Sequence, residues 1–272
     1  MTRTTRTPAD LRDTVVLVTG ARGSIGSATT AAFAARGATV VGLDLPDTGG
    51  AGSGTDGILA CDLTDEAQVR ATVQQVVATH GRLDVLVNNA GISAIGSIED
   101  HDLATHRQVL EVNHLGALAV TLAALPHLRS AAGAVVTIGS VAGFAPVVGR
   151  PAYVAAKHAV TGLMEALRPE LAADGVHVAM VHPTFVTTAL ATAAGSRDRS
   201  TTGTRVSPRQ VAEAVVDSVT HRRDRVLVGR TARLAWHAHR LAPRTYARLM
   251  TRRLSTRSNT RPSSHPQETP PA

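Results

Sequence analysis

Residues 14–26, with the sequence TVVLVTGARGSIG, decide the fold. The first six form a β-branched apolar run typical of a buried strand, and the alanine-rich stretch to about residue 36 is typical of a helix. The glycines between them let the chain turn sharply and let backbone N–H groups approach a pyrophosphate at the helix N-terminus, which Ser24 is expected to cap. Glycines are common in loops, but a cluster between a buried strand and a helix predicts a dinucleotide-binding turn. The predicted contacts are Gly20, Arg22, Gly23, Ser24, Ile25 and Gly26.

The rest of the chain repeats this alternation of short apolar runs and helical patterns. Continuous Val, Ile and Leu runs separated by helices indicate a parallel sheet covered on both faces. We therefore predict an α/β protein: a single-domain Rossmann fold whose doubly wound parallel sheet of about seven strands carries helices on both faces. The expected strands are residues 14–19, 39–43, 58–61, 83–87, 134–138, 176–181 and 225–228, and long helices are expected at 65–79, near 100–129, at 152–173 and at 208–221.

Composition and charge separate the ends of the chain from its body. Residues 1–196 carry a net charge of −4, whereas residues 197–272 carry +11, so the basic character belongs to the C-terminal quarter. Segments rich in Thr, Ser, Arg and Pro do not form a packed core. The predicted segments are a disordered arm (1–12), a Rossmann-type dinucleotide-binding catalytic domain (13–230), a basic amphipathic helix (231–254) and a disordered tail (255–272).

Several classes of protein are disfavoured by composition. The single cysteine, Cys61, excludes an internal disulfide framework and provides no zinc-ligand spacing, so no metal site is predicted. The polar N-terminus lacks the hydrophobic core of a secretory signal, and no apolar stretch is expected to reach membrane-spanning length. We therefore expect a cytoplasmic protein. Aromatic residues make up 2% of the chain, which offers no stacking platform for single-stranded nucleic acid and makes such a partner unlikely.

Asp44 lies at the end of the second predicted strand, 18 residues after Gly26. A carboxylate at this position of a dinucleotide-binding unit accepts hydrogen bonds from the adenosine ribose and repels a 2′-phosphate. Arg22 argues in the opposite direction, because a guanidinium in the turn can pair with a 2′-phosphate. The acid would still have to be accommodated, so we predict NAD, with NADP as the alternative.

Lys157 is the only lysine among 28 basic residues. Arginine cannot replace lysine where a compact ammonium with a movable pKa is needed, so a lysine in so arginine-rich a chain is a candidate for chemistry. Tyr153 precedes it by four residues, which places both on one face of a helix. A phenol has an ordinary pKa of about 10, and a nearby ammonium and an oxidised nicotinamide both lower it. The pair predicts general acid–base catalysis.

Further motifs follow in order: Asp62-Leu63, Asn88-Asn89-Ala90-Gly91, Asn113 in a long helix, Ser140 thirteen residues before Tyr153, and Pro183 to Thr188. Together with the glycine turn and the Tyr153–Lys157 pair, they resemble the short-chain dehydrogenases/reductases, in their shorter single-domain branch, over about residues 14–230. The resemblance implies the catalytic residues Asn113, Ser140, Tyr153 and Lys157. It also implies cofactor contacts at Asp62, Leu63, Asn89, Ala90, Gly91, Tyr153, Lys157, Pro183, Val186 and Thr188.

The resemblance also implies a mechanism. Tyr153 exchanges a proton with the alcohol or carbonyl as hydride passes to or from the nicotinamide, and Ser140 hydrogen-bonds the substrate oxygen. Lys157 binds the nicotinamide ribose, and Asn113 positions a water that links Lys157 to solvent. A homodimer or homotetramer formed through the helices near 100–129 and 152–173 is expected on the same ground.

Two departures from the family pattern keep alternatives open. Gly23 comes one position early and Ser24 stands where glycine is usual, a spacing that resembles the sugar epimerases and dehydratases of the longer branch. Thr184 follows Pro183 where glycine is usual, which stiffens the loop after the sixth strand. A dinucleotide-binding sensor without turnover is a further alternative, although it would be expected to have lost part of the Asn, Ser, Tyr and Lys set.

The segments predicted to wall the substrate site are residues 141–150 and 184–206. The first is largely apolar, which favours an apolar secondary alcohol or ketone as the substrate, and the second, with Arg197 and Arg199, is expected to be a mobile lid. The apolar residues of the 231–254 helix are expected to cover this pocket or pack on another subunit. Peripheral contact with an anionic membrane through this basic helix is possible but not favoured.

Overall fold

The computed structural model describes residues 11–46, 57–186 and 205–258, and within them the chain forms a parallel sheet. Its strand order is β3-β2-β1-β4-β5-β6-β7, which is the predicted doubly wound arrangement. Nearly every residue of the central strands is buried, as expected for a parallel sheet covered on both faces. The strands are β1 (Val15–Thr19), β2 (Thr39–Asp44), β3 (Ile58–Ala60), β4 (Val85–Asn88), β5 (Ala134–Ile138), β6 (His177–Pro183) and β7 (Arg225–Val228).

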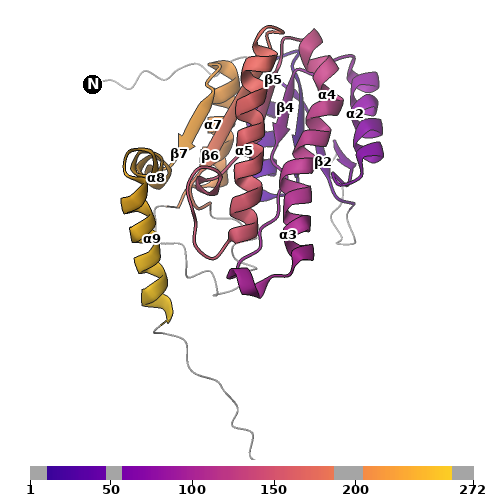
Figure 1. The fold of residues 1–272 in the computed structure, drawn as a ribbon. Coiled ribbons are helices and arrows are strands. Elements are labelled where there is room, and N and C mark those ends of the chain that lie inside the picture. Colours follow the sequence, from indigo (N-terminus) through magenta and orange to yellow (C-terminus); the bar gives the residue numbers. More distant parts are fainter. Residues whose placement is uncertain (1–10, 47–56, 187–204, 259–272) are drawn as a thin grey trace, which may run out of the picture.

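Helices cover the two faces of the sheet (Figure 1). Two separate apolar cores lie between these helices and the sheet. One core lies beneath α2 (Glu66–His80), α4 (Gly116–Ser130) and α5 (Pro151–Ala172). The other lies beneath α1 (Ser24–Ala34) and α7 (Pro208–Thr220). The three-layer α/β prediction is therefore confirmed.

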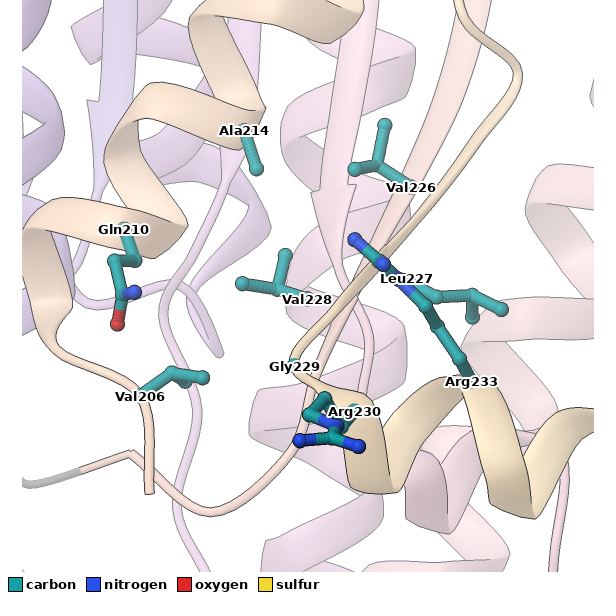
Figure 2. A pocket seen from close by; sticks show the side chains of 9 residues that line it. All are labelled: Val206, Gln210, Ala214, Val226, Leu227, Val228, Gly229, Arg230 and Arg233. Atoms are coloured by element: carbon teal, nitrogen blue, oxygen red, sulfur yellow. The ribbon is translucent and has the colours of Figure 1, made fainter. Parts of the chain in front are cut away.

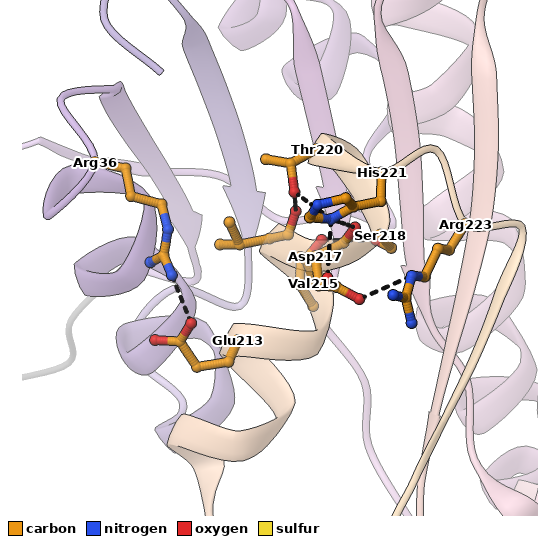
Figure 3. A network of polar contacts seen from close by, with 9 residues as sticks. Arg36, Glu213, Val215, Asp217, Ser218, Thr220, His221 and Arg223 are labelled. Atoms are coloured by element: carbon orange, nitrogen blue, oxygen red, sulfur yellow. Dashed lines mark hydrogen bonds and ion pairs between the residues drawn. The ribbon is translucent and has the colours of Figure 1, made fainter. Parts of the chain in front are cut away.

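Polar contacts fix α7 against the rest of its layer (Figure 3). Arg36, just after α1, forms a 2.6 Å ion pair with Glu213 of α7. At the other end of α7, Asp217 accepts contacts from His221 at 2.9 Å and from Arg223 at 3.1 Å. These contacts lie where α7 ends and the chain enters β7, so they hold the strand that leads to the C-terminal helices.

Residues 103–130 form one continuous helix of 28 residues, composed of α3 (Leu103–Leu110), a π-helical turn η2 (Glu111–Leu115) and α4. By length and composition it could cross a membrane, so the expectation that no apolar stretch has that length is wrong. The apolar residues Val120, Ala124 and Leu128 are fully buried against the sheet, which accounts for much of the apolar character of this helix.

The C-terminal region contains two helices where one was predicted over residues 231–254. These are α8 (Arg230–Leu241) and α9 (Pro243–Ser258), and α9 extends away from the sheet (Figure 1). Pro243 cannot donate to the helix and disfavours a helical conformation at Ala242, which has φ −140° and ψ 60°. The helix also continues past residue 254, into the first residues of the predicted tail.

Candidate active site

The predicted site residues that the structure describes lie along the carboxyl edge of the sheet, on both sides of the point between β1 and β4 where the strand order changes direction. Thr19, the last residue of β1, ties the two strands together: its Oγ1 accepts hydrogen bonds of 3.0 Å from the backbone N–H groups of Asn89 and Ala90. Asn89 returns two hydrogen bonds through Nδ2, to Thr19 O at 2.8 Å and Gly20 O at 3.0 Å. The glycine turn and the Asn89–Gly91 segment therefore form one rigid edge.

The glycine turn leads into α1 without a side-chain cap. Gly23, not Ser24, is the N-cap, and Ser24 is the first helical residue, so the predicted capping role of Ser24 is wrong. A Cβ at Gly26 would lie 2.1 Å from Gly20 O, so this position requires glycine. The uncapped N–H groups of the first turn are the kind of donors that bind a pyrophosphate.

Asp44 and Arg22 lie together at the tip of β2. The Asp44 carboxylate accepts hydrogen bonds from the backbone N–H of Arg22 at 2.7 Å and of Leu45 at 2.9 Å. The Arg22 guanidinium is directed to the carbonyl oxygen of Leu45, at 2.8 Å. The carboxylate is therefore fixed at the edge of the glycine turn, where an adenosine ribose is expected.

Asp62 and Leu63 follow β3 at the neighbouring strand end. Asp62 Oδ1 accepts hydrogen bonds from the backbone N–H and the hydroxyl of Thr64, at 2.9 and 2.8 Å. Leu63 packs close to Gly116 at the start of α4. Both residues thus lie on the side of the site where the predicted adenine would be.

Ser140 and Tyr153 are joined across the site. Ser140 follows β5, its Oγ accepts a 3.1 Å hydrogen bond from Ala142 N, and its side chain also hydrogen-bonds Tyr153. Burial raises the pKa of Tyr153, while the hydrogen bond from Ser140 and the charge of Arg150 oppose the rise. The predicted lowering of this pKa is therefore not the net result in the protein alone, because desolvation of the phenolate outweighs the favourable contacts.

Lys157 is 5% exposed, one turn beyond Tyr153 on α5, and its Nζ lies 5.7 Å from the tyrosine ring centroid. Its ammonium donates a 2.9 Å hydrogen bond to Ile138 O at the end of β5. Burial lowers the pKa of Lys157 from 10.5 to about 8, so the group is still mostly protonated at neutral pH. A buried, compact ammonium of this kind is a group that arginine replaces poorly.

Asn113 lies in the π-helical turn η2, a feature that no sequence signal predicted. Its Nδ2 donates to Ile92 O at 2.9 Å and to Val109 O at 2.8 Å, while its buried Oδ1 has no partner among the described residues. A Cβ on Gly91 would lie 2.6 Å from Asn113 Oδ1 and 3.6 Å from Lys157 Nζ, so both groups face this glycine. An unsatisfied acceptor beside an ammonium fits a bridging water.

His182 is a site residue that sequence reasoning missed. It is fully buried in β6, its Nδ1 lies 3.1 Å from Ser140 O, and its ring meets Phe144 edge-on at 5.3 Å. Burial lowers its pKa from 6.5 to about 4, so the ring is neutral and Nδ1–H donates to Ser140. The sequence shows only a histidine directly before Pro183, and this position does not predict that its side chain contacts Ser140.

The segment after β6 is described only in part. Pro183 ends the strand and Val186 forms a parallel bridge with Val206, whereas Thr188 and the rest of residues 187–204, most of the predicted lid, lie outside the described residues. Thr184, where the family pattern has glycine, is buried and its N–H donates to Val228 O at 3.0 Å. Its methyl carbon, Cγ2, contacts Gly229 so closely that a Cβ added to this glycine would lie 2.6 Å from it. The stiffened loop is thus packed against the end of β7.

The apolar segment that follows Ser140 is covered by the C-terminal helices. Phe144 meets Trp236 of α8 edge-on at 5.0 Å, and Tyr246 of α9 packs on Ala145. These helices therefore pack on the loop that was predicted to wall the substrate site, and their covering of the pocket itself stays a prediction.

Residues 14–199 match the model of the short chain dehydrogenases, which is more than half of the chain. This chain belongs to the short-chain dehydrogenase/reductase family. The rat protein "Dehydrogenase/reductase SDR family member 7B" is 32% identical over 92% of this chain and 84% of its own length. "Trans-4-hydroxycyclohexanecarboxylate dehydrogenase" of Sinomonas cyclohexanicum is 36% identical over 64% of this chain and 73% of its own. Ligand-free aldohexose dehydrogenase of Thermoplasma acidophilum superposes with a TM-score of 0.74 at 28% identity, covering 82% of this chain and 95% of that one.

Family membership makes the chain an oxidoreductase with a nicotinamide dinucleotide cofactor. The residues at the strand ends fit such a cofactor. The first turn of α1 presents uncapped backbone donors, Asp44 lies at the tip of β2, and the Asn113 acceptor next to Lys157 lacks a partner among the described residues. The Ser140, Tyr153 and Lys157 side chains lie together at the carboxyl end of β5.

Proposed function

We propose that the protein transfers hydride between NAD and an apolar secondary alcohol or ketone, with Tyr153 as the general acid–base. The observation that carries this proposal is the contact between Ser140 and Tyr153 beside the buried Lys157 ammonium. The same three groups in separate places would each have an ordinary structural role. Their convergence at one strand end supports catalysis instead.

Each side chain has a task that follows from its surroundings. Ser140 holds the substrate oxygen through a hydroxyl whose position is fixed by Ala142 N. Tyr153 exchanges a proton with that oxygen, and Lys157 supplies a positive charge that stabilises the phenolate formed in the oxidation direction. Asn113, whose Oδ1 lacks a partner among the described residues, holds the water through which Lys157 exchanges protons with solvent. When bound, the nicotinamide supplies the hydride acceptor or donor.

NAD is the proposed cofactor because the fixed Asp44 carboxylate would repel a 2′-phosphate. Arg22 lies beside it, but its guanidinium is already bonded to the carbonyl oxygen of Leu45. An arginine in that position is less available to bind a phosphate.

The proposed substrate is an alicyclic secondary alcohol or its ketone. The loop from Val141 to Pro146 is apolar, and Trp236 and Tyr246 cover it from the far side. The name of the Sinomonas relative, with a hydroxyl on a cyclohexane ring, supports the same class. The sugar substrate named for the Thermoplasma neighbour is the contrasting case.

The test is an absorbance assay at the 340 nm band of the reduced nicotinamide. Wild-type protein and Tyr153→Phe are offered NAD or NADP with cyclohexanols, larger alicyclic alcohols, the matching ketones, and an aldohexose. The expected result is turnover of an alicyclic alcohol, faster with NAD, which Tyr153→Phe abolishes while retaining cofactor binding. Tight NAD binding with no turnover of any substrate would favour a sensor, and turnover of the aldohexose alone would refute the apolar substrate.

The proposed assembly is a homo-oligomer formed through the helix of residues 103–130. Leucines on this helix remain exposed although its opposite side is buried in the core. An apolar face of this kind is typical of a subunit interface. The exposed leucines are Leu103, Leu110, Leu115 and Leu122.

A further inference from the structure

The apolar residues of the C-terminal helices divide into two sets that face opposite ways. Trp236 and Tyr246 point to the body of the protein and cover the loop after Ser140. Leu234, Leu241 and Leu249 are exposed to 70%, 83% and 50%. The contacts of the inward set hold these helices on the protein, whereas the outward set belongs to none of the apolar clusters formed by the described residues.

The outward leucines of α8 form a stripe. Leu234 and Leu241 are seven residues apart, which places them on one face of the helix. Arg230 and His237 share this face and are also exposed. The opposite face of α8, with Ala232 and Ala235, is buried. The helix is therefore amphipathic in an unusual sense: its solvent face combines large apolar side chains with cationic ones.

The charge around this stripe has one sign. Residues 230–258, which form α8 and α9, contain eight arginines and neither aspartate nor glutamate. Among the residues that the structure describes, no ion pair involves the arginines of these helices up to residue 251. These arginines are Arg230, Arg233, Arg240, Arg244 and Arg248. Neighbouring Arg225, by contrast, is paired with Glu165.

A hollow of about 330 Å³ lies where α8 begins, between this helix, β7 and the start of α7. Figure 2 shows Arg230 and Arg233 beside the apolar side chains of Val206, Val226 and Val228. The lining of the hollow therefore combines positive charge with apolar side chains, as the exposed face of α8 does.

We propose that α8 and α9 form a docking surface for an anionic lipid bilayer. Arginines attract anionic headgroups, and leucines on the same face gain free energy by entering the boundary between headgroups and acyl chains. A second copy of this chain fits poorly, because a twofold contact would bring the arginines of both copies together. A nucleic acid would explain the arginines but not the exposed leucines.

The orientation has a consequence for the enzyme. The inward face of the same two helices covers the loop next to Ser140, so the docked surface lies close to the side of the site where an apolar substrate enters. An alicyclic alcohol or ketone that partitions into the bilayer would reach the enzyme from there. This part rests on the proposed function, whereas vesicle binding itself does not.

The test is co-sedimentation of the full chain with vesicles of phosphatidylcholine, with or without phosphatidylserine, at low and high salt. Binding is expected only with phosphatidylserine and is expected to weaken with salt. Two double variants probe the two components: Leu234→Ser with Leu241→Ser, and Arg230→Gln with Arg233→Gln. Each should lower the partition coefficient by roughly tenfold or more. Arg70→Gln with Arg107→Gln, on exposed positions of α2 and α3, is the charge-matched control and should bind as wild type does.

Four results would overturn the proposal: no sedimentation with anionic vesicles at low salt, equal binding to phosphatidylcholine alone, full binding by the leucine variant, or full binding by the arginine variant. Tighter binding to duplex DNA than to vesicles at equal salt, unchanged in the leucine variant, would also overturn it and assign the surface to nucleic acid. The leucine variant should retain wild-type turnover of a soluble substrate, which separates failure of docking from failure of the proposed function.

Discussion

Lys157 combines three properties that an arginine could not reproduce: burial, a hydrogen bond to Ile138 O, and a position above the Tyr153 ring. A guanidinium is planar and larger and distributes its charge over a fork of donors. In the space between β5 and α5 it could not direct one compact charge to the phenol oxygen. The charge is therefore not the whole requirement at this position.

Lys157→Arg is expected to lower kcat/KM by about a hundredfold or more, although the net charge is unchanged. The measurement is steady-state kinetics with the substrate found in the 340 nm assay, together with thermal unfolding to verify the fold. Arg70→Lys, at an exposed pair with Glu66, is the reverse exchange and should leave turnover unchanged.

If the arginine variant is too unstable to assay, Lys157→Ala with added methylamine provides a second measurement. An ammonium supplied in solution should restore part of the lost rate. Near-normal turnover of Lys157→Arg, or an alanine variant as active as wild type, would contradict the proposed need for a compact ammonium.

His182 makes the free energy of unfolding depend on pH. Burial lowers the pKa of His182 from 6.5 to about 4 in the folded protein. Between these two pH values the unfolded chain binds a proton at His182 and the native state does not. Stability is therefore lost as the pH falls from 6.5 towards 4, by roughly 3 kcal/mol for the whole shift. His182→Gln, which is neutral and can still donate to Ser140 O, should flatten this part of the curve.

The measurement is urea unfolding at several pH values between 4 and 7 for wild type and variant. His158→Gln, at an exposed histidine on α5, should keep the wild-type slope. Equal slopes for wild type and His182→Gln would show that His182 is not the group that titrates.

These residues also separate what a sequence can reveal from what it cannot. Tyr153 and Lys157 could be paired in advance because helical spacing is local and periodic. The contact of His182 with Ser140 depends on the register of β6 against β5, where Gly139 N donates to Val181 O at 2.8 Å. The register between two strands that lie far apart in the sequence cannot be predicted from a short window of residues.

At the scale of elements, the strands were the most predictable part of the fold. The runs of residues 134–138 and 225–228 match β5 and β7 residue for residue. In β5 the reason is that a buried parallel strand needs a continuous apolar run, whereas β7 is a half-buried edge strand. The π-helical turn around Asn113 could not be predicted, since its residues Glu111–Leu115 include neither proline nor glycine, and Gly116 directly after it continues as helix. The break at Pro243 could have been predicted from proline alone, but the apolar pattern on both sides concealed it.

Gly229, between β7 and α8, is the element boundary most sensitive to substitution. It has φ +98°, and a Cβ there would meet Thr184 Cγ2 at 2.6 Å. Gly229→Ala should therefore destabilise the protein by about 1–3 kcal/mol. Gly162→Ala is the matched change: this exposed glycine lies inside α5 with nothing within 4 Å of the added Cβ, and the substitution should stabilise by about 0.5–1 kcal/mol. Denaturant unfolding measures both, and changes of the same sign would contradict the argument.

For the whole molecule, two exposed apolar faces occur in different electrostatic settings. The face on the helix of residues 103–130 belongs to the acidic body of the chain, whereas the face on α8 and α9 lies among arginines. A neutral or mixed face can meet a copy of itself, but a face of uniform positive charge needs an anionic partner. The sequence showed this division of charge, but the direction in which each leucine points required the fold.

Leu115→Glu with Leu122→Glu is therefore expected to convert the proposed homo-oligomer into a monomer. The two leucines are seven residues apart on one exposed helix face, so a twofold contact would bring like charges from both copies into an apolar interface at a cost of several kcal/mol. Light scattering coupled to size-exclusion chromatography gives the mass of wild type and variant.

Leu234→Ser with Leu241→Ser should keep the wild-type mass while losing vesicle binding, which assigns the two faces to different partners. A wild-type monomer, or a variant that keeps the oligomeric mass, would refute this interface. Loss of the oligomer in the serine variant would instead show that α8 is the subunit contact, and the arginines around Leu234 would then need acidic neighbours from the other copy.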